Sequence, residues 1–126
     1  MKSEVYKDQA RLFGALSHPA RLRILELLAQ GEACVCHLCV LLQARQAYVS
    51  QQLATLKQAG LITDRRDGLY VYYTLTHEGI ARLLAEGRLC LALLGGEETV
   101  QEAQVPEKED MDCSCPRCQD NRQKPR

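Results

Sequence analysis

Three cysteines lie within six residues of one another, as Cys34, Cys36 and Cys39 in a Cys-x-Cys-x-x-Cys pattern. Thiolate sulfur is a soft ligand, so the cluster suits arsenite, antimonite, Cd(II), Pb(II), Zn(II) or Cu(I) better than hard ions. A structural zinc ion normally takes four ligands, whereas As(III) and Sb(III) form three bonds because a lone pair fills the remaining position. Three sulfurs without an obvious fourth ligand therefore predict a trigonal pyramidal site, with arsenite as the first candidate.

The spacing of these cysteines also predicts a conformational change on ion binding. At about 100° per residue, Cys36 and Cys39 share one helical face, but Cys34 lies about 200° from Cys36. The three sulfurs cannot converge on an unbroken helix, so capture of an ion must unwind or redirect the first helical turn. His37 is expected to be solvated rather than a fourth ligand. For Cys39 the alternative is a small buried apolar residue.

A second cluster near the end of the chain, Cys113, Cys115 and Cys118, repeats the same spacing. It follows an acidic stretch, residues 97–112, that is poor in apolar residues and reads as a flexible linker. Three interpretations stay open: a second soft-metal site, a scavenger that passes ions to the first cluster, or a bystander on a disordered tail.

Length and composition predict one compact domain, residues 1–96, followed by an acidic Cys-rich tail, residues 97–126. The 1–96 segment holds 11 Lys/Arg against 8 Asp/Glu, and the tail holds 5 against 8, so only the body suits contact with nucleic acid. Seven cysteines in a chain without a secretory signal or a long apolar run indicate reduced thiols and a cytoplasmic protein that contacts no membrane.

The apolar periodicity predicts a mainly α fold with one β-hairpin. Helices are expected over 5–16, 35–42, 46–58 and 76–94. A further helix is expected from Pro19 to Gly31, with Ser17 as the cap and with Arg21, Arg23 and Glu26 facing water. Residues 61–75 alternate with a period of two, and Asp67-Gly68 marks the turn of the hairpin. The two short helices before the hairpin form a helix-turn-helix, and the hairpin is its wing. The first and last helices carry excess apolar surface, which predicts a homodimer.

The outward face of the 46–58 helix carries amides, hydroxyls and a tyrosine, which can donate to and accept from base edges in the major groove. The alternative is a solvated helix face, and the order of the elements favours double-stranded DNA. Basic side chains on either side could hold phosphates. The predicted DNA-binding residues are Arg45, Gln46, Tyr48, Ser50, Gln51, Thr55, Lys57, Arg65 and Arg66.

Five segments together resemble the ArsR/SmtB winged-helix metalloregulators, and most closely their arsenic-responsive repressors. These segments are Leu16 to Leu25, Cys34 to Cys39, Val49 to Leu53, Gly60 to Ile62 and Arg65 to Gly68. The resemblance implies a homodimeric repressor that binds a palindromic operator and releases it when arsenite binds Cys34, Cys36 and Cys39. Two positions depart from the family pattern: Arg45 replaces a capping Ser or Thr, and Gln52 replaces a histidine.

Alternative functions remain beside the arsenite-responsive repressor. Oxidation or persulfidation of paired thiols could also release DNA, as could Cd, Pb or Zn. The Cys39-x5-Arg45 spacing matches oxyanion-binding enzyme loops, but Val40-Leu41-Leu42 reads as buried helix, so we expect no enzyme activity and no organic cofactor. The Asp/His metal site that some family members carry on the last helix is not assigned, because His77, Glu78 and Glu86 lack its spacing.

Overall fold

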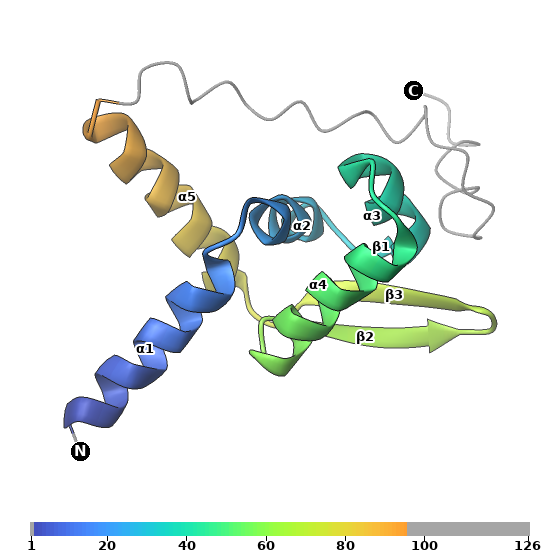
Figure 1. Ribbon diagram of the computed structural model, residues 1–126, viewed down its shortest axis with the longest axis horizontal. Coiled ribbons are helices and arrows are strands. Elements are labelled where there is room, and N and C mark those ends of the chain that lie inside the picture. The colour runs from blue at the N-terminus through green and yellow to red at the C-terminus, as the bar shows by residue number, and fades with distance from the viewer. Residues whose placement is uncertain (1, 96–126) are drawn as a thin grey trace.

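The computed structural model describes residues 2–95, which form five helices and a three-stranded sheet (Figure 1). In chain order the elements are α1 (Lys2–Leu16), α2 (Pro19–Ala29), β1 (Ala33–Cys34), α3 (Val35–Leu42), α4 (Gln46–Gln58), β2 (Ile62–Asp67), β3 (Tyr70–Leu75) and α5 (Glu78–Leu93). Helix α2 lies at the centre, with α1 and α5 on one side and α3, α4 and the β2–β3 hairpin on the other. This is the predicted winged helix-turn-helix. None of the helices in this part of the chain is long and apolar enough to cross a membrane.

The core lies where α2, α3 and α4 meet, because each of these helices turns one apolar row inward. Ile24 and Leu25 of α2, Leu38 of α3 and Val49 of α4 are all fully buried. Helix α4 packs directly against α3, and both helices contact α2. A shift of α3 would therefore displace side chains of α4, because a close-packed interior transmits strain.

The start of α2 differs from the prediction that Ser17 would cap it. His18 is the capping residue, because its backbone is extended and its Nδ1 accepts a hydrogen bond from the backbone N–H of Ala20 at 3.1 Å. Pro19 occupies the first helical position, where its missing N–H removes no helix hydrogen bond. A neutral imidazole nitrogen can serve in the same way as the oxygen of a capping serine.

Of the three charged residues of α2 predicted to face water, Arg23 is exposed, whereas Arg21 and Glu26 are half-buried. Arg21 donates from Nε to the Ala15 carbonyl at 2.7 Å and from Nη1 to Oε1 of Gln52 at 3.2 Å. Arg23 donates from Nη2 to the Leu41 carbonyl at 3.0 Å. These arginines join α2 to the end of α1, to α3 and to α4, so they help to hold the helix-turn-helix in place.

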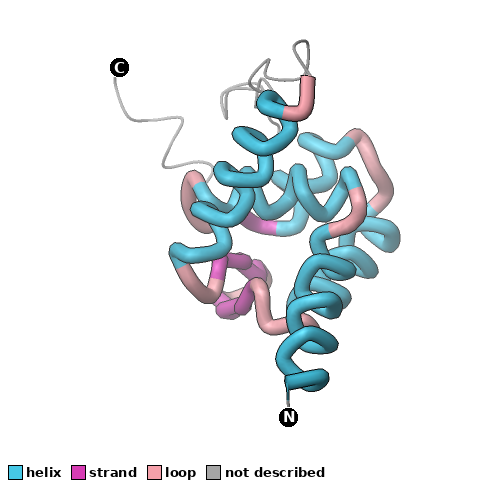
Figure 2. The backbone as a smooth tube through the Cα atoms, turned by 90° about the vertical axis from the view of Figure 1, so that its left-hand side faces the viewer, coloured by secondary structure: helices cyan, strands magenta, loops and turns pink. Residues whose placement is uncertain are grey.

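The strands gather on one side of the molecule in the order β1-β3-β2, with both pairs antiparallel (Figure 2). Asp67 pairs with Tyr70, so the two-residue turn consists of Gly68 and Leu69, one position later than predicted. Gly68 has a φ of +61°, which favours glycine. The short strand β1 was not predicted. It pairs with β3 through Ala33 opposite Tyr73 and Cys34 opposite Tyr72.

Replacing Gly60 with alanine is expected to lower the free energy of unfolding by about 1 to 2 kcal/mol, because a left-handed backbone is unfavourable for alanine. Gly60 follows α4 with a φ of +78°. Gly14→Ala within α1 is the matched control, expected to raise the free energy of unfolding by up to about 1 kcal/mol. A Cβ would meet no atom within 4 Å at either position, so the backbone alone should decide the sign in urea denaturation. Equal changes in the free energy of unfolding for the two substitutions would contradict a specific need for glycine at position 60.

Candidate functional site

Cys34 joins the sheet to the helix-turn-helix. It is the second residue of β1 and also the residue that precedes the first turn of α3, with φ −87° and ψ 164°. Its side chain is only 3% exposed and packs against Tyr72 of β3, which is 1% exposed. Cys34 therefore lies outside the helix, as the angular argument required, and its movement would disturb both the sheet and the start of α3.

Cys36 and Cys39 lie on α3 itself, one turn apart. The Sγ atom of Cys36 is 3.0 Å from the Sγ atom of Cys34, so two of the three predicted ligands lie side by side. Cys36 is disulfide-bonded in this structure, so it must be reduced before its sulfur can bind an ion. Cys39 packs against the main core, and burial raises the pKa of its thiol. Within residues 2–95, no group of three or more Cys, His, Asp or Glu side chains is arranged to hold a metal ion.

His37 is 2% exposed, so the expectation of a solvated histidine is wrong. It is buried on α3 together with Leu38 and Leu41, whereas the neighbouring Cys36 is exposed. The second cysteine cluster, Cys113, Cys115 and Cys118, lies outside the described residues, as does the acidic linker.

Helix α4 presents a polar outer face, as predicted. Val49, Gln52, Leu53 and Leu56 form its buried row. Gln46, Tyr48, Ser50 and Gln51 are exposed on the other side. Gln52, one of the two departures from the family pattern, is 7% exposed and accepts the hydrogen bond from Arg21. Gln52 therefore has a structural role in this chain.

Three of the predicted DNA-binding residues already have partners within the protein. Thr55 donates from Oγ1 to the Gln51 carbonyl at 3.2 Å, and Nζ of Lys57 lies 2.9 Å from Oδ1 of Asp64. Arg65 forms an ion pair with Glu32, whose hydrogen bond is the largest cause raising the pKa of the guanidinium. Thr55 and Lys57 would have to exchange a protein partner for DNA.

Arg45 and Arg66 are also exposed. Arg45 precedes the first turn of α4 and makes no side-chain cap, and Arg66 lies opposite Val71 on the wing. The outer face of α4 also exposes Ala47, Ala54 and Gln58, which were not among the predicted DNA-binding residues. Alanine is a useful signal here, because a methyl group allows close approach and can contact the thymine methyl in the major groove.

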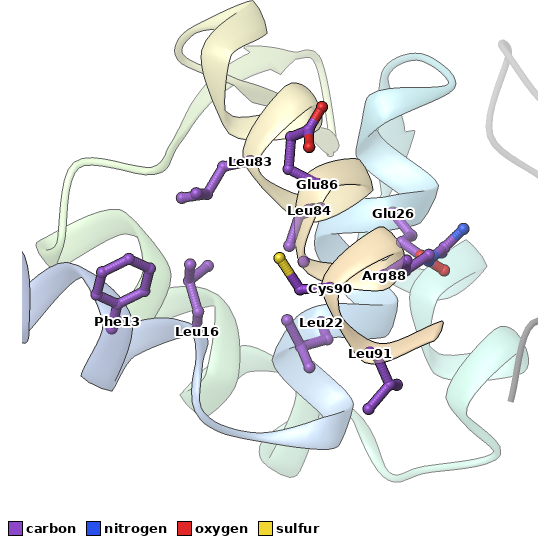
Figure 3. A pocket seen from close by; sticks show the side chains of 11 residues that line it. Phe13, Leu16, Leu22, Glu26, Leu83, Leu84, Glu86, Arg88, Cys90 and Leu91 are labelled. Atoms are coloured by element: carbon purple, nitrogen blue, oxygen red, sulfur yellow. The ribbon is translucent and has the colours of Figure 1, made fainter. Parts of the chain in front are cut away.

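A third feature is an apolar cavity of about 500 Å³ between α1, α2 and α5 (Figure 3). Phe13 and Leu91 are 45% and 48% exposed at its edge, and the sulfur of Cys90 points into it. Arg88 of α5 forms an ion pair with Glu26 of α2 beside the cavity. A surface of this kind is typical of an interface with another protein chain.

Comparison with known proteins agrees with this geometry. Residues 18–64 match the model of the family described as bacterial regulatory protein, arsR family. The uncharacterized HTH-type transcriptional regulator Rv0081 of Mycobacterium tuberculosis is 43% identical over 94 residues, covering 73% of this chain and 82% of that protein. The arsenical resistance operon repressor of Escherichia coli is 43% identical over 67 residues, covering 52% of this chain and 57% of the repressor.

Solved structures have the same fold. The crystal structure of Rv0081 superposes with a TM-score of 0.69 at 39% identity, covering 74% of this chain and 94% of that one. The solution structure of the homodimeric winged helix-turn-helix DNA-binding domain of Mb0332 from Mycobacterium bovis has a TM-score of 0.67 at 35% identity, covering 72% of this chain and 84% of that one. With its helix-turn-helix, wing and exposed polar α4 face, the chain belongs to the arsR family and is a DNA-binding transcriptional repressor rather than an enzyme.

Proposed function

We propose that this repressor acts as a homodimer and releases its operator when As(III) binds the thiols of Cys34, Cys36 and Cys39. The observation that carries the proposal is the 3.0 Å separation of the Cys34 and Cys36 sulfurs at the start of α3. This helix packs against α4, the helix with the exposed polar face. An ion that rearranges the start of α3 is therefore well placed to disturb DNA binding.

The donor set favours a soft ion with three bonds. Neutral arsenous acid can exchange its three hydroxyl groups for three thiols with loss of three waters, which leaves no net charge to bury beside the core. Antimonite has the same preference, whereas zinc would need a fourth ligand. The arsenical resistance repressor of Escherichia coli, by its name, supports an arsenical as the inducer.

Ion capture and DNA binding compete because they require different arrangements of the α3 start. Cys34 is extended and paired in β1, while Cys36 and Cys39 are held on the helix. Bringing all three sulfurs to one ion must change the first turn of α3 or the pairing of β1. Coupling free energies of this kind are typically about 1 to 3 kcal/mol, or about 5- to 150-fold in affinity.

On DNA, α4 would enter the major groove and the wing would follow the backbone. Gln46, Tyr48, Ser50 and Gln51 would contact base edges, and Arg45 and Arg66 would contact phosphates. Thr55 and Lys57 would join them only after leaving their present partners, while Arg65 would keep its ion pair with Glu32. The apolar cavity between α1 and α5, together with the homodimeric state of Mb0332, supports dimerisation through these helices and hence a two-fold symmetric operator.

Replacing Gln51 with alanine is expected to weaken specific operator binding by about 1 to 3 kcal/mol, because an amide that reads a base edge is lost. Replacing Arg66 with glutamine should weaken all sequences alike and reduce the slope of log affinity against log salt by about 1. Gln30→Ala, at an exposed position after α2, is the control. Both effects would be measured by fluorescence anisotropy on operator and scrambled duplexes. An equal loss on both duplexes for Gln51→Ala would contradict its role in base reading.

The test of the proposed inducer is the release of labelled operator DNA from the reduced full-length protein at fixed salt. Arsenite, antimonite, Zn(II), Cd(II) and a persulfide donor would be titrated separately, without competing dithiols. Release at a near-stoichiometric dose of arsenite is the expected result. The close Cys34–Cys36 pair makes a redox sensor the second candidate, and release by the persulfide donor alone would establish it in place of arsenite sensing.

A further inference from the structure

A charged pair connects the strand that carries Cys34 to the wing. Arg65 of β2 donates from Nε to Oε2 of Glu32 at 2.6 Å and from Nη2 to Oε1 of the same carboxylate at 2.6 Å. Glu32 comes directly before β1, and its side chain is 11% exposed. Such bidentate arginine–carboxylate pairs are short, directional and stronger than single-contact pairs. This pair is therefore a specific link between two segments 33 residues apart in the sequence.

Tyr72 lies between the cysteine and the arginine. It is the strand partner of Cys34 on one side and of Arg65 on the other, so the three residues form one row across the sheet. Residues directly opposite each other on neighbouring strands project from the same face. The guanidinium carbon of Arg65 lies 4.7 Å from the centre of the Tyr72 ring, which also packs against Cys34. The ring of Tyr72 thus contacts both Cys34 of β1 and Arg65 of β2.

We propose that Glu32, Arg65 and Tyr72 form a wing clamp that holds β1 on β3 and transmits movement of Cys34 to the wing. In this role Arg65 and Glu32 are positioning residues for the switch. The clamp exists only while Cys34 stays paired with Tyr72, so it opposes the displacement that ion capture requires. When Cys34 leaves β1, Glu32 moves with it and the wing loses the contact that orients it. The ion-dependent part of this inference rests on the proposed function.

The test compares Glu32→Gln, Arg65→Gln and the control Arg66→Gln in the reduced full-length protein, without DNA. Arg66 is the exposed neighbour of Arg65 on β2. Arg66→Gln therefore removes the same positive charge as Arg65→Gln but leaves the Glu32–Arg65 pair in place. The first readout is the alkylation rate of Cys34, followed by peptide mass spectrometry with Cys39 as the internal control. The second readout is arsenite affinity. Loss of one bidentate pair predicts an increase of about three- to tenfold in both quantities for both clamp variants.

The directions of change in the Glu32→Gln and Arg65→Gln proteins distinguish loss of the clamp from a simple electrostatic effect on Cys34. Removing the Glu32 charge favours a nearby thiolate, whereas removing the Arg65 charge disfavours it, so electrostatics alone would move the variants in opposite directions. If the clamp exists, Glu32→Gln and Arg65→Gln both raise the alkylation rate of Cys34 and the arsenite affinity. The double variant should differ little from either single variant. Arg66→Gln should leave both quantities unchanged, and the alkylation rate of Cys39 should stay the same in all variants. Opposite changes, no change, or equal acceleration at Cys39 would each overturn the clamp.

Failure of the clamp and failure of arsenite sensing give different results in these measurements. If the variants expose Cys34 as predicted but arsenite does not release operator from the unmodified protein, then the clamp stands and arsenite sensing fails. If arsenite releases operator but neither variant changes Cys34 reactivity or arsenite affinity, then the sensor stands and the clamp fails.

Discussion

The Cys34→Ser protein is expected to bind operator about as tightly as the unmodified protein and to remain bound when arsenite is added. A hydroxyl oxygen is a hard, weakly acidic ligand, so a soft ion loses one of its three bonds. Cys34 is the one proposed ligand that lies in β1 and outside α3, so its loss removes the differential binding on which release depends. The expected result is loss of the whole arsenite effect, about 5- to 150-fold in operator affinity, measured by anisotropy titration.

Cys36→Ser and Cys39→Ser are expected to behave in the same way, because two thiols cannot replace three. Cys90→Ser on α5 is the control, since Cys90 lies in the apolar cavity away from α3. Circular dichroism and urea denaturation would establish that each variant is folded. Normal arsenite release from the Cys34→Ser or Cys36→Ser protein would contradict the three-thiol site, and release retained only in Cys39→Ser would leave Cys39 as a core residue.

The Leu91→Glu protein is expected to be monomeric and to bind operator about 100-fold or more weakly. Leu91 lines the apolar cavity between α1 and α5 and is 48% exposed, so the single chain can tolerate a carboxylate there. A dimer interface cannot, because burying an unpaired charge is strongly unfavourable. Two linked DNA-reading units gain about 10²- to 10⁴-fold over one, and this gain is lost in the monomer.

The control for Leu91→Glu is Ala85→Glu, which adds the same charge at an exposed position on α5 outside the cavity lining. Sedimentation velocity would give the oligomeric state, and anisotropy would give the operator affinity. A Leu91→Glu protein that stays dimeric would show that the apolar face of α1 and α5 is not the interface. A monomer with unchanged operator affinity would show that DNA binding does not need the dimer.

Local patterns were sufficient to predict most of the elements. Helix α4 was predicted with its observed bounds, because its apolar row repeats at helical spacing and Gly60 ends it. The hairpin followed from its period of two and from Gly68, although the turn lies one residue later than predicted. Near His18 the helix boundary was right but the predicted cap was wrong, because propensity favours serine while the residue directly before the helix is His18, which accepts the hydrogen bond of Ala20.

The amino-acid sequence by itself determined the winged helix-turn-helix, the polar face of α4 and the spacing of the three cysteines on and before α3. These features depend on the spacing of residues that lie close together in the sequence, so they can be recognised from the sequence alone. The tertiary structure alone decided that Cys34 belongs to a strand, that His37 is buried, and that Arg65 pairs with Glu32. A two-residue strand has no periodicity, and pairing between residues 33 positions apart leaves no local pattern. The partners of these side chains exist only once the helices and the wing have packed together.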